Sequence, residues 1–172
     1  MKIFLIGLMS CGKTTLGKQL AKSMGIVFMD MDLEIERKEG KSIPEIFSQN
    51  GEDAFREMER EVLSSIVNMK EDLVVSTGGG APCFHHNIDV MNVAGVTVFL
   101  DVSADEITNR LLKSHYLQAR PLLAEKSPEK LLEYIKELLE KRKPIYLESK
   151  LILTDDAITI SKLLKNLDEM ED

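Results

Sequence analysis

Short apolar runs alternate with amphipathic stretches along most of the chain. The apolar runs predict strands over residues 3–6, 26–29, 73–76, 96–100 and 151–153. Apolar positions at helical spacing predict helices over residues 15–24, 32–39, 42–49, 52–69, 104–113 and 158–167, and a further long helical stretch from residue 128. Because short apolar strands separated by helices pair in parallel and are covered on both faces, this order predicts a three-layer α/β/α fold.

Two segments depart from the alternation. Residues 35–59 place helices between the second and third predicted strands, where a short crossover would suffice. Residues 114–127, with the sequence SHYLQARPLLAEKS, connect two long helical stretches. A connection of that length in a compact domain is often a lid or a binding loop, and the alternative is a plain surface loop. With no internal repeat and no linker, residues 1–172 are expected to form a single domain.

Composition and charge exclude several classes of protein. The chain has 172 residues with 22 Lys+Arg and 29 Asp+Glu, and a net charge of −7 argues against binding nucleic acid or an anionic membrane surface. No apolar stretch approaches the roughly 18 residues of a transmembrane helix, and the N-terminal run is too short for a signal peptide. The spacing of Cys11 and Cys83 is neither a zinc motif nor a disulfide framework. We therefore expect a cytoplasmic protein with reduced thiols.

The strongest motif follows the first predicted strand. Residues 7–14, GLMSCGKT, match G-x-x-x-x-G-K-[ST] and lie between a strand and a helix, as the motif requires. The glycines let backbone N–H groups turn inward around phosphate oxygens, and the helix N-terminus adds positive potential. In this motif Lys13 reaches the β- and γ-phosphates, and the Thr14 hydroxyl binds Mg²⁺. The residues expected to bind the nucleotide here are Ser10, Cys11, Gly12, Lys13, Thr14 and Thr15.

A phosphate-binding loop does not specify the reaction. A GTPase would carry D-x-x-G and N-K-x-D, and neither pattern occurs. A motor ATPase would need a larger chain and an apolar strand that ends in Asp-Glu, which is missing. A small chain with an inserted helical segment and a lid favours a metabolite kinase that uses ATP.

Candidate residues for the acceptor follow the second and third predicted strands. Strand alternation would place the carboxylates of Asp30 and Asp32 on one side, at the sheet edge where α/β proteins bind ligands. One could support Mg²⁺ through water and the other could bind or deprotonate a hydroxyl, although either could instead cap a helix. The triplet Gly78, Gly79 and Gly80 would let a ligand approach the main chain.

The arginines on the predicted helices are harder to interpret. Arg56 lies between the two candidate acceptor regions, but Glu52 and Glu59 are within pairing distance along the same helix. The residues alone therefore leave open whether Arg56 binds a ligand. Arg37 and Arg60 have several acidic neighbours, and we expect both to be solvated and paired.

The order of the motifs resembles that of the shikimate kinase family. Over residues 2–146 the motifs are GLMSCGKTT, MDMD, IPEIFSQNGEDAFREMERE, STGGG, ARPLL and RKPIY. The resemblance implies a P-loop NTPase fold of the nucleoside-monophosphate-kinase type, with a five-stranded parallel sheet, a substrate-binding helical segment over residues 32–60 and a mobile lid over residues 113–127. It implies an enzyme that transfers the γ-phosphoryl group of ATP to the 3-hydroxyl of shikimate, with Mg²⁺, on the route to chorismate and aromatic amino acids. We expect the protein to be a monomer.

The resemblance also implies roles for residues on the acceptor side. Asp32 would bind ring hydroxyls of shikimate and orient the attacking one, or act as its base. The remaining acceptor contacts would be Arg56 and Arg142 to the carboxylate, the backbone of Gly78, Gly79 and Gly80 to the hydroxyls, and Phe47 and Phe55 to the apolar side of the ring.

On the donor side the resemblance implies a second set of roles. Thr14 would be a direct ligand of Mg²⁺, and Asp30 would support the ion through water. Arg120 in the lid would close over the phosphates and assist catalysis together with Lys13. Arg110 matches the position that stacks on adenine.

Two alternatives remain open at the level of sequence. One is a related small-metabolite kinase such as gluconate kinase, which shares the P-loop. The other is a P-loop module that binds nucleotide without turnover. The carboxylates and arginines argue against the second alternative, because a protein that only binds nucleotide needs neither.

Overall fold

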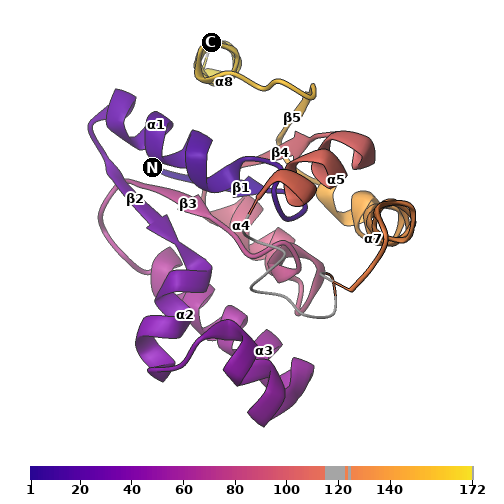
Figure 1. The fold of residues 1–172 in the computed structure, drawn as a ribbon. Helices are drawn as coiled ribbons and strands as arrows, with labels where there is room; N and C mark the ends of the chain where they lie inside the picture. Colours follow the sequence, from indigo (N-terminus) through magenta and orange to yellow (C-terminus); the bar gives the residue numbers. More distant parts are fainter. Residues whose placement is uncertain (115–122, 124, 172) are drawn as a thin grey trace.

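A five-stranded parallel sheet forms the centre of the molecule (Figure 1). The structure is a computed structural model that describes residues 1–114, 123 and 125–171. The strands are β1 (Lys2–Ile6), β2 (Val27–Asp30), β3 (Leu73–Ser76), β4 (Val96–Asp101) and β5 (Leu151–Thr154). Their order is β2-β3-β1-β4-β5, and every neighbouring pair is parallel. The predicted α/β fold with a five-stranded parallel sheet is confirmed.

The sheet register brings the carboxyl ends of three strands to one edge. Ser76, the last residue of β3, pairs with Leu5 of β1 on one side and with Asp30 of β2 on the other. Residues that follow β1, β2 and β3 in the sequence therefore meet in space. This edge carries the candidate site, as is usual for open α/β sheets.

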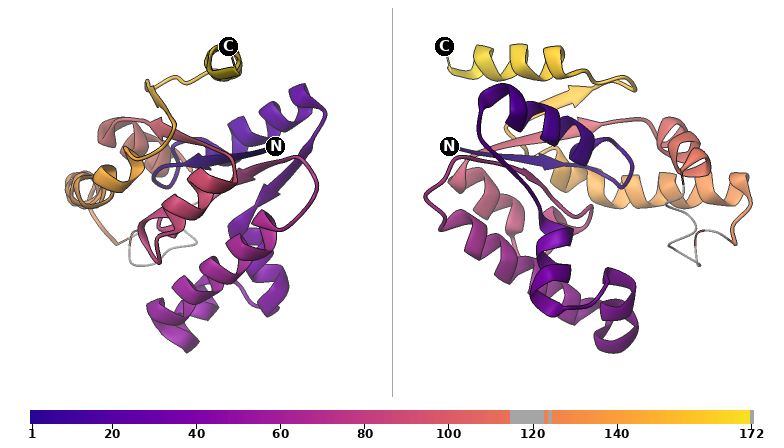
Figure 2. Two further views of the ribbon diagram at one scale, coloured as in Figure 1. Left: turned by 180° about the vertical axis from the view of Figure 1, so that it is seen from behind. Right: turned by 60° about the vertical axis from the view of Figure 1, so that its left-hand side comes forward.

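Helices cover both faces of the sheet. They are α1 (Lys13–Met24), α2 (Met31–Glu39), α3 (Ile43–Val67), α4 (Asn87–Ala94), α5 (Ala104–Lys113), α7 (Pro128–Tyr146) and α8 (Ile160–Glu171), with a short 3₁₀ turn η1 (Ala81–Cys83). Helices α1 and α8 lie on one face, and α3, α4 and α7 lie on the other (Figures 1 and 2). The central strand β1 is buried on both faces, since the side chains of Ile3, Phe4, Leu5 and Ile6 are at most 1% exposed. Burial on both faces explains why its sequence reads as a continuous apolar run.

The two helices predicted over residues 42–49 and 52–69 are both present, and they join at Gly51 to form the element α3. It begins with a capping box, in which the backbone N–H of Ser42 donates to the Glu45 carboxylate at 2.8 Å, and Pro44 lies in its first turn. Gly51 interrupts the helical backbone with a φ of 81°, a value that favours glycine. The prediction of two helices is therefore confirmed, since two helical spans meet at a kink at Gly51 within α3.

Helix α4 and the turn η1 were not predicted. The buried apolar positions of α4 are only Ile88 and Met91, which are too few to show a helical period. In the part of the chain that the structure describes, no helix is long and apolar enough to span a bilayer.

Candidate active site

The P-loop connects β1 to α1 through a backbone with several left-handed residues. Gly7 has a φ of 138°, Ser10 of 58° and Gly12 of 109°. This curled path lets the Lys13 side chain fold back into the loop, where its Nζ donates to the carbonyl oxygens of Gly7 at 2.8 Å and Leu8 at 2.7 Å. The Lys13 ammonium is thereby held at the mouth of the loop, 8% exposed, where phosphate oxygens would bind.

Three side-chain oxygens meet beside the P-loop. The Thr14 hydroxyl donates to Asp30 Oδ2 at 2.9 Å, and the hydroxyls of Thr14 and Ser76 are 3.3 Å apart. The three oxygens suit Mg²⁺, which takes oxygen ligands and in kinases keeps several waters besides one or two protein groups and the substrate phosphates. Among the described residues there is no cluster of three or more His, Cys, Asp or Glu suited to a metal, so the chain offers this partial set and no closed protein cage.

Asp30 and Asp32 reach the site by a different route from the one predicted. Strand β2 ends at Asp30, which caps α2 by accepting from the backbone N–H of Asp32 at 3.1 Å. Asp32 is therefore helical, and the prediction that strand alternation places both carboxylates on one side is wrong. Asp30 lies beside Thr14, whereas Asp32 lies beside Gly78, where a Cβ atom would be 2.8 Å from Asp32 Oδ1. The helix start separates the two carboxylates and gives each a different neighbour.

The glycine triplet after β3 lies in the middle of the site. A Cβ atom on Gly78 would lie 2.7 Å from Glu59 Oε1, and one on Gly80 would lie 2.5 Å from Arg56 Nη1. A Cβ atom on Gly79 would lie 3.4 Å from Arg142 Nη1, and 3.5 Å from the Gly7 carbonyl oxygen of the P-loop. The triplet thus touches the phosphate-binding loop on one side and the charged acceptor residues on the other, with no room for side chains at Gly78 and Gly80.

Arg56 is buried and already paired. Its guanidinium contacts Glu59 at 2.6 Å and Glu52 at 2.9 Å, its side chain is 8% exposed, and it lies 4.3 Å from the centre of the Phe84 ring. The pairing that the sequence left open is therefore present, yet Arg56 still lies against Gly80.

Glu59, the partner of Arg56, is a buried acid whose pKa is strongly raised. Its side chain is 1% exposed, and Oε1 has no hydrogen-bond partner among the described residues. Burial raises the pKa of the Glu59 carboxyl to about 7, the nearby Arg56 opposes the rise, and Asp32 adds to it. Glu59 is thus a carboxyl group that exchanges its proton near neutral pH inside the site.

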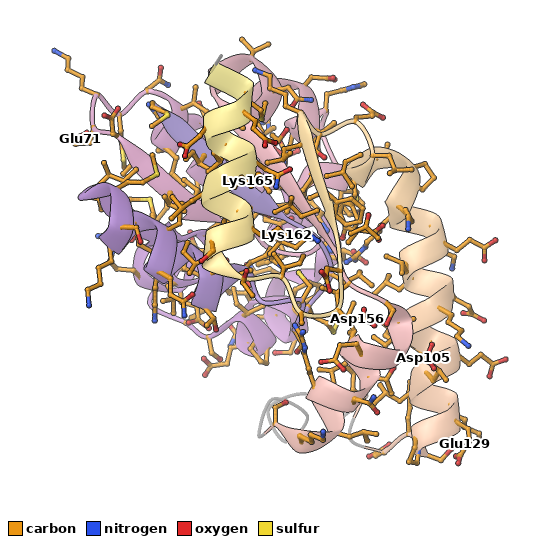
Figure 3. The ribbon with its side chains drawn as sticks, turned by 90° about the horizontal axis from the view of Figure 1, so that it is seen from above. Glu71, Asp105, Glu129, Asp156, Lys162 and Lys165 are labelled. Atoms are coloured by element: carbon orange, nitrogen blue, oxygen red, sulfur yellow. The ribbon has the colours of Figure 1, made fainter. Side chains whose placement is uncertain are left out.

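Glu59 should make the stability of the protein fall as pH rises. Its native pKa of about 7 lies above the ordinary value of 4.5, so the native state holds the proton more tightly than the unfolded state does. The resulting stability is present below the unfolded pKa and is lost as pH rises through the native pKa, with a slope of up to roughly 1.4 kcal/mol per pH unit. Urea unfolding from about pH 5 to about pH 8 measures this slope, which Glu59→Gln should reduce. Glu71→Gln, on the surface (Figure 3), should keep the wild-type slope, and equal slopes for wild type and Glu59→Gln would contradict the prediction.

Arg142 differs from the other described arginines. Arg37, Arg56, Arg60 and Arg110 each pair with a glutamate, whereas Arg142 forms no ion pair with any described residue. Arg142 is half-buried near the end of α7 and lies over Gly79. A half-buried guanidinium beside a glycine turn is a suitable site for a ligand carboxylate. The expected pairing of Arg37 with Glu34 and of Arg60 with Glu57 is confirmed.

Two aromatic rings from α3 lie next to each other, on either side of Gly51. The ring centroids of Phe47 and Phe55 are 4.6 Å apart. Phe55 is 4% exposed and lies 5.3 Å from the Arg56 guanidinium, whereas Phe47 is 37% exposed. Of these two rings, only that of Phe47 therefore presents a substantial apolar surface to solvent.

A pocket of about 400 Å³ lies between α1, α5 and the start of α8. Its lining includes Cys11, Gly12, Thr15, Arg110, Ile158 and Thr159. Arg110 anchors the pocket wall, because its guanidinium donates to Glu106 at 2.7 Å, to the Cys11 carbonyl at 3.2 Å and to the Asp156 carbonyl (Asp156 is labelled in Figure 3). The pocket borders the P-loop at Cys11 and Gly12. A pocket for the base of a nucleotide has to lie next to the loop that holds the phosphates, and this pocket meets that condition.

Some residues of the site were not predicted from the sequence, and one predicted residue lies outside the described part of the chain. Arg120 and most of the predicted lid over residues 113–127 lie outside the described residues. The sequence identifies Glu59 only as a neighbour of Arg56, and it assigns no role to Ser76 or Tyr146. Ser76 carried a usable signal, since it ends a strand directly before the glycine triplet. The burial of Glu59 depends on packing and has no local signal.

The molecule is a P-loop kinase with a fold of the nucleoside-monophosphate-kinase type. This class is defined by the strand order, by the P-loop after β1 and by the acidic and arginine side chains at the same edge of the sheet. A family model described as shikimate kinase matches residues 9–170. The chain therefore belongs to the shikimate kinase family.

Individual relatives agree with the family model. A shikimate kinase of Parabacteroides distasonis is 47% identical over 157 residues, which cover 91% of this chain and 87% of that protein. The crystal structure of shikimate kinase from Bacteroides thetaiotaomicron matches with a TM-score of 0.91 at 40% identity, over 99% of this chain and 98% of that one. Shikimate kinase from Acinetobacter baumannii in complex with shikimate matches with a TM-score of 0.83 at 34% identity, over 99% and 92% of the two chains.

Proposed function

We propose that this chain transfers the γ-phosphoryl group of ATP to the 3-hydroxyl of shikimate, and so supplies shikimate 3-phosphate for chorismate and aromatic amino-acid synthesis. Membership of the shikimate kinase family supports the activity. The observation that carries it to this chain is the position of Gly79, which lies between the P-loop and Arg142. The donor phosphates and an acceptor carboxylate would therefore bind close together, on opposite sides of Gly79.

On the acceptor side, we assign Arg142 to the shikimate carboxylate, because its guanidinium forms no ion pair with a described residue. Arg56 adds a second positive charge beside Gly80, already shared with Glu59. Asp32 lies at the opposite end of the triplet and is assigned to the ring hydroxyls. The remaining contacts are assigned to the backbone of Gly78, Gly79 and Gly80 and to the rings of Phe47 and Phe55.

On the donor side, we assign the phosphates to the P-loop backbone and to Lys13. Thr14 is assigned as a direct ligand of Mg²⁺, and Asp30 supports the ion through water. When bound, Mg²⁺ supplies positive charge against the phosphate oxygens. The other assigned nucleotide contacts are Ser10, Cys11, Gly12, Thr15, Arg110 and Arg120.

The chain's own groups would perform the transfer by positioning and by neutralising charge. Asp32 orients the attacking hydroxyl and accepts its proton as the bond from that oxygen to the γ-phosphorus of ATP forms and the bond from the γ-phosphorus to the β–γ bridging oxygen breaks, with ADP as the leaving group. Lys13 stabilises the charge that develops on the transferred oxygens. The segment over residues 113–127, which carries Arg120, is assigned as the lid that keeps water from the phosphoryl group, and residues 32–60 are assigned as the substrate-binding segment.

We further propose that the protein acts as a cytoplasmic monomer that binds neither nucleic acid nor membranes. All the assigned groups come from one chain, so a second subunit is not required to complete the site. The net charge of −7 disfavours polyanionic partners.

The test of the activity is the release of ADP from ATP with and without shikimate, with gluconate as the alternative acceptor. We expect release to depend on shikimate. Release that depends on gluconate instead would favour the alternative kinase, and tight ATP binding with no turnover on either acceptor would favour a binding module.

Substituting Arg142→Ala should raise the KM for shikimate by roughly 30-fold, about 2 kcal/mol, with a smaller change in kcat. The reason is that a carboxylate acceptor loses a guanidinium that forms no ion pair with a described residue, whereas the groups that contact the reacting atoms are unchanged. Steady-state kinetics with each substrate varied in turn measures the effect. Arg60→Ala, an exposed arginine paired with Glu57, should leave all constants unchanged. An Arg142→Ala enzyme with the wild-type KM for shikimate would remove Arg142 from the acceptor site.

A further inference from the structure

Tyr146 is a completely buried side chain that reaches the glycine triplet. It is the last residue of α7, its side chain is 0% exposed, and its ring packs on Phe99 of β4 with centroids 5.0 Å apart. Its hydroxyl donates to the carbonyl oxygen of Gly79. Burial raises the pKa of the phenol, so the hydroxyl remains protonated and acts as a donor.

The hydrogen bond fixes the orientation of one peptide plane. No cis peptide is present in the described chain, and in a planar trans peptide the C=O and the N–H point in opposite directions. When Tyr146 holds the carbonyl of Gly79, the N–H of Gly80 must point away from Tyr146. That N–H donates to no described residue, and Gly80 lies against the guanidinium of Arg56.

Helix α7 contacts the triplet through two side chains on one face. Arg142 and Tyr146 are four residues apart, so they project from the same side of the helix. Arg142 lies over Gly79 while Tyr146 binds the carbonyl of the same residue. The Tyr146 hydroxyl also accepts a hydrogen bond from the Arg142 side chain. Because the same hydroxyl donates to the Gly79 carbonyl, it links the Arg142 guanidinium to the Gly79–Gly80 peptide and sets the spacing between that guanidinium and the Gly80 N–H.

We propose that Tyr146 is a positioning residue for the acceptor site, whose hydroxyl holds the Gly79–Gly80 peptide so that the Gly80 N–H is presented to a substrate hydroxyl at a fixed distance from Arg142. This inference rests on the proposed function. A phenylalanine would fill the same core volume, but glycine peptides have large conformational freedom, and nothing else described binds the Gly79 carbonyl. The hydroxyl is hydrogen-bonded to the glycine triplet and, among the described residues, to no part of the P-loop, so its main effect is expected on the acceptor.

The test is Tyr146→Phe, which removes only the hydroxyl. We expect the KM for shikimate to rise about five- to ten-fold, the effect of leaving one buried carbonyl without its donor, while kcat and the KM for ATP stay within about two-fold. In ¹H–¹⁵N spectra of the full chain, the amide signals of Gly79 and Gly80 should shift before shikimate is added. Tyr134→Phe is the matched control, since Tyr134 lies on the same helix and its ring contacts Lys126.

The outcomes separate the alternatives. An unchanged KM for shikimate, or unchanged glycine amide signals, would overturn the proposal. A fall in thermal stability with equal losses for both substrates would also overturn it, because it would show that Tyr146 is only a core residue. Failure of the proposed function is distinguished by the wild type, which would then release no ADP in response to shikimate.

Discussion

Lys13→Ala is expected to lower kcat by about a thousand-fold. The Lys13 ammonium is held at the mouth of the P-loop by the carbonyls of Gly7 and Leu8, so it is fixed before the nucleotide binds. A fixed charge aimed at the oxygens that become more negative in the transition state contributes roughly 3–4 kcal/mol, which is the size of the loss predicted. Kinetics at saturating ATP and shikimate measures kcat.

Lys18→Ala is the control for this substitution. Lys18 lies on the same helix, exposed near the Phe28 ring, and should leave kcat unchanged. Thermal melting of both variants checks that α1 is intact. If kcat of Lys13→Ala stayed within about ten-fold of wild type, Lys13 would have no role in stabilising the transferred group.

Asp32→Asn should also lower kcat strongly, by about two to four orders of magnitude, which is the typical contribution of a general base. The amide has the shape of the carboxylate and can still bind a hydroxyl, but it cannot accept the proton of the attacking oxygen. The KM for shikimate should change much less than kcat. Steady-state kinetics with shikimate varied at saturating ATP separates the two constants.

Asp53→Asn, an exposed residue of α3, is the matched control and should have wild-type kinetics. An Asp32→Asn enzyme with the wild-type kcat would show that Asp32 takes no part in catalysis. A rise in KM alone would show that Asp32 binds the hydroxyl without acting as its base.

The elements with the strongest patterns were predicted correctly. The apolar runs of β1 and β3 and the amphipathic helix that became the second part of α3 depend on residues that follow one another, so their pattern is visible in the sequence. Helix α4 was missed, because a short helix with two buried positions carries little periodicity. The boundary between the two helical spans of α3 was predicted, because Gly51 lies between two stretches that each have a helical period.

The site was predicted unevenly for the same reason. The P-loop, the glycine triplet and the two aspartates stand out as motifs, and their positions at strand ends place them at one sheet edge. The argument from strand alternation for Asp32 was wrong, because the chain turns into a helix at Met31 and the period changes from two to 3.6 residues.

Neighbouring residues in the sequence do not decide which of the six arginines binds a ligand. Glu52 and Glu59 are both within helical pairing distance of Arg56, four and three residues away, but only packing makes Glu59 a buried partner and leaves Glu52 at the surface. Arg142 has acidic residues nearby in the chain, and only its position over Gly79 shows that its guanidinium faces the site.

The features that depend on consecutive residues were thus visible in the sequence itself: a loop that binds phosphate, a parallel α/β sheet and an acidic composition. These follow from backbone conformation and hydrophobic periodicity, which are local. The partners of each charge were settled by the folded molecule, as in the hydrogen bond between Tyr146 and Gly79, which are 67 residues apart. Desolvation is the physical reason, because whether a charge or hydroxyl is free for a ligand depends on what packs around it, and packing is made by residues distant in sequence.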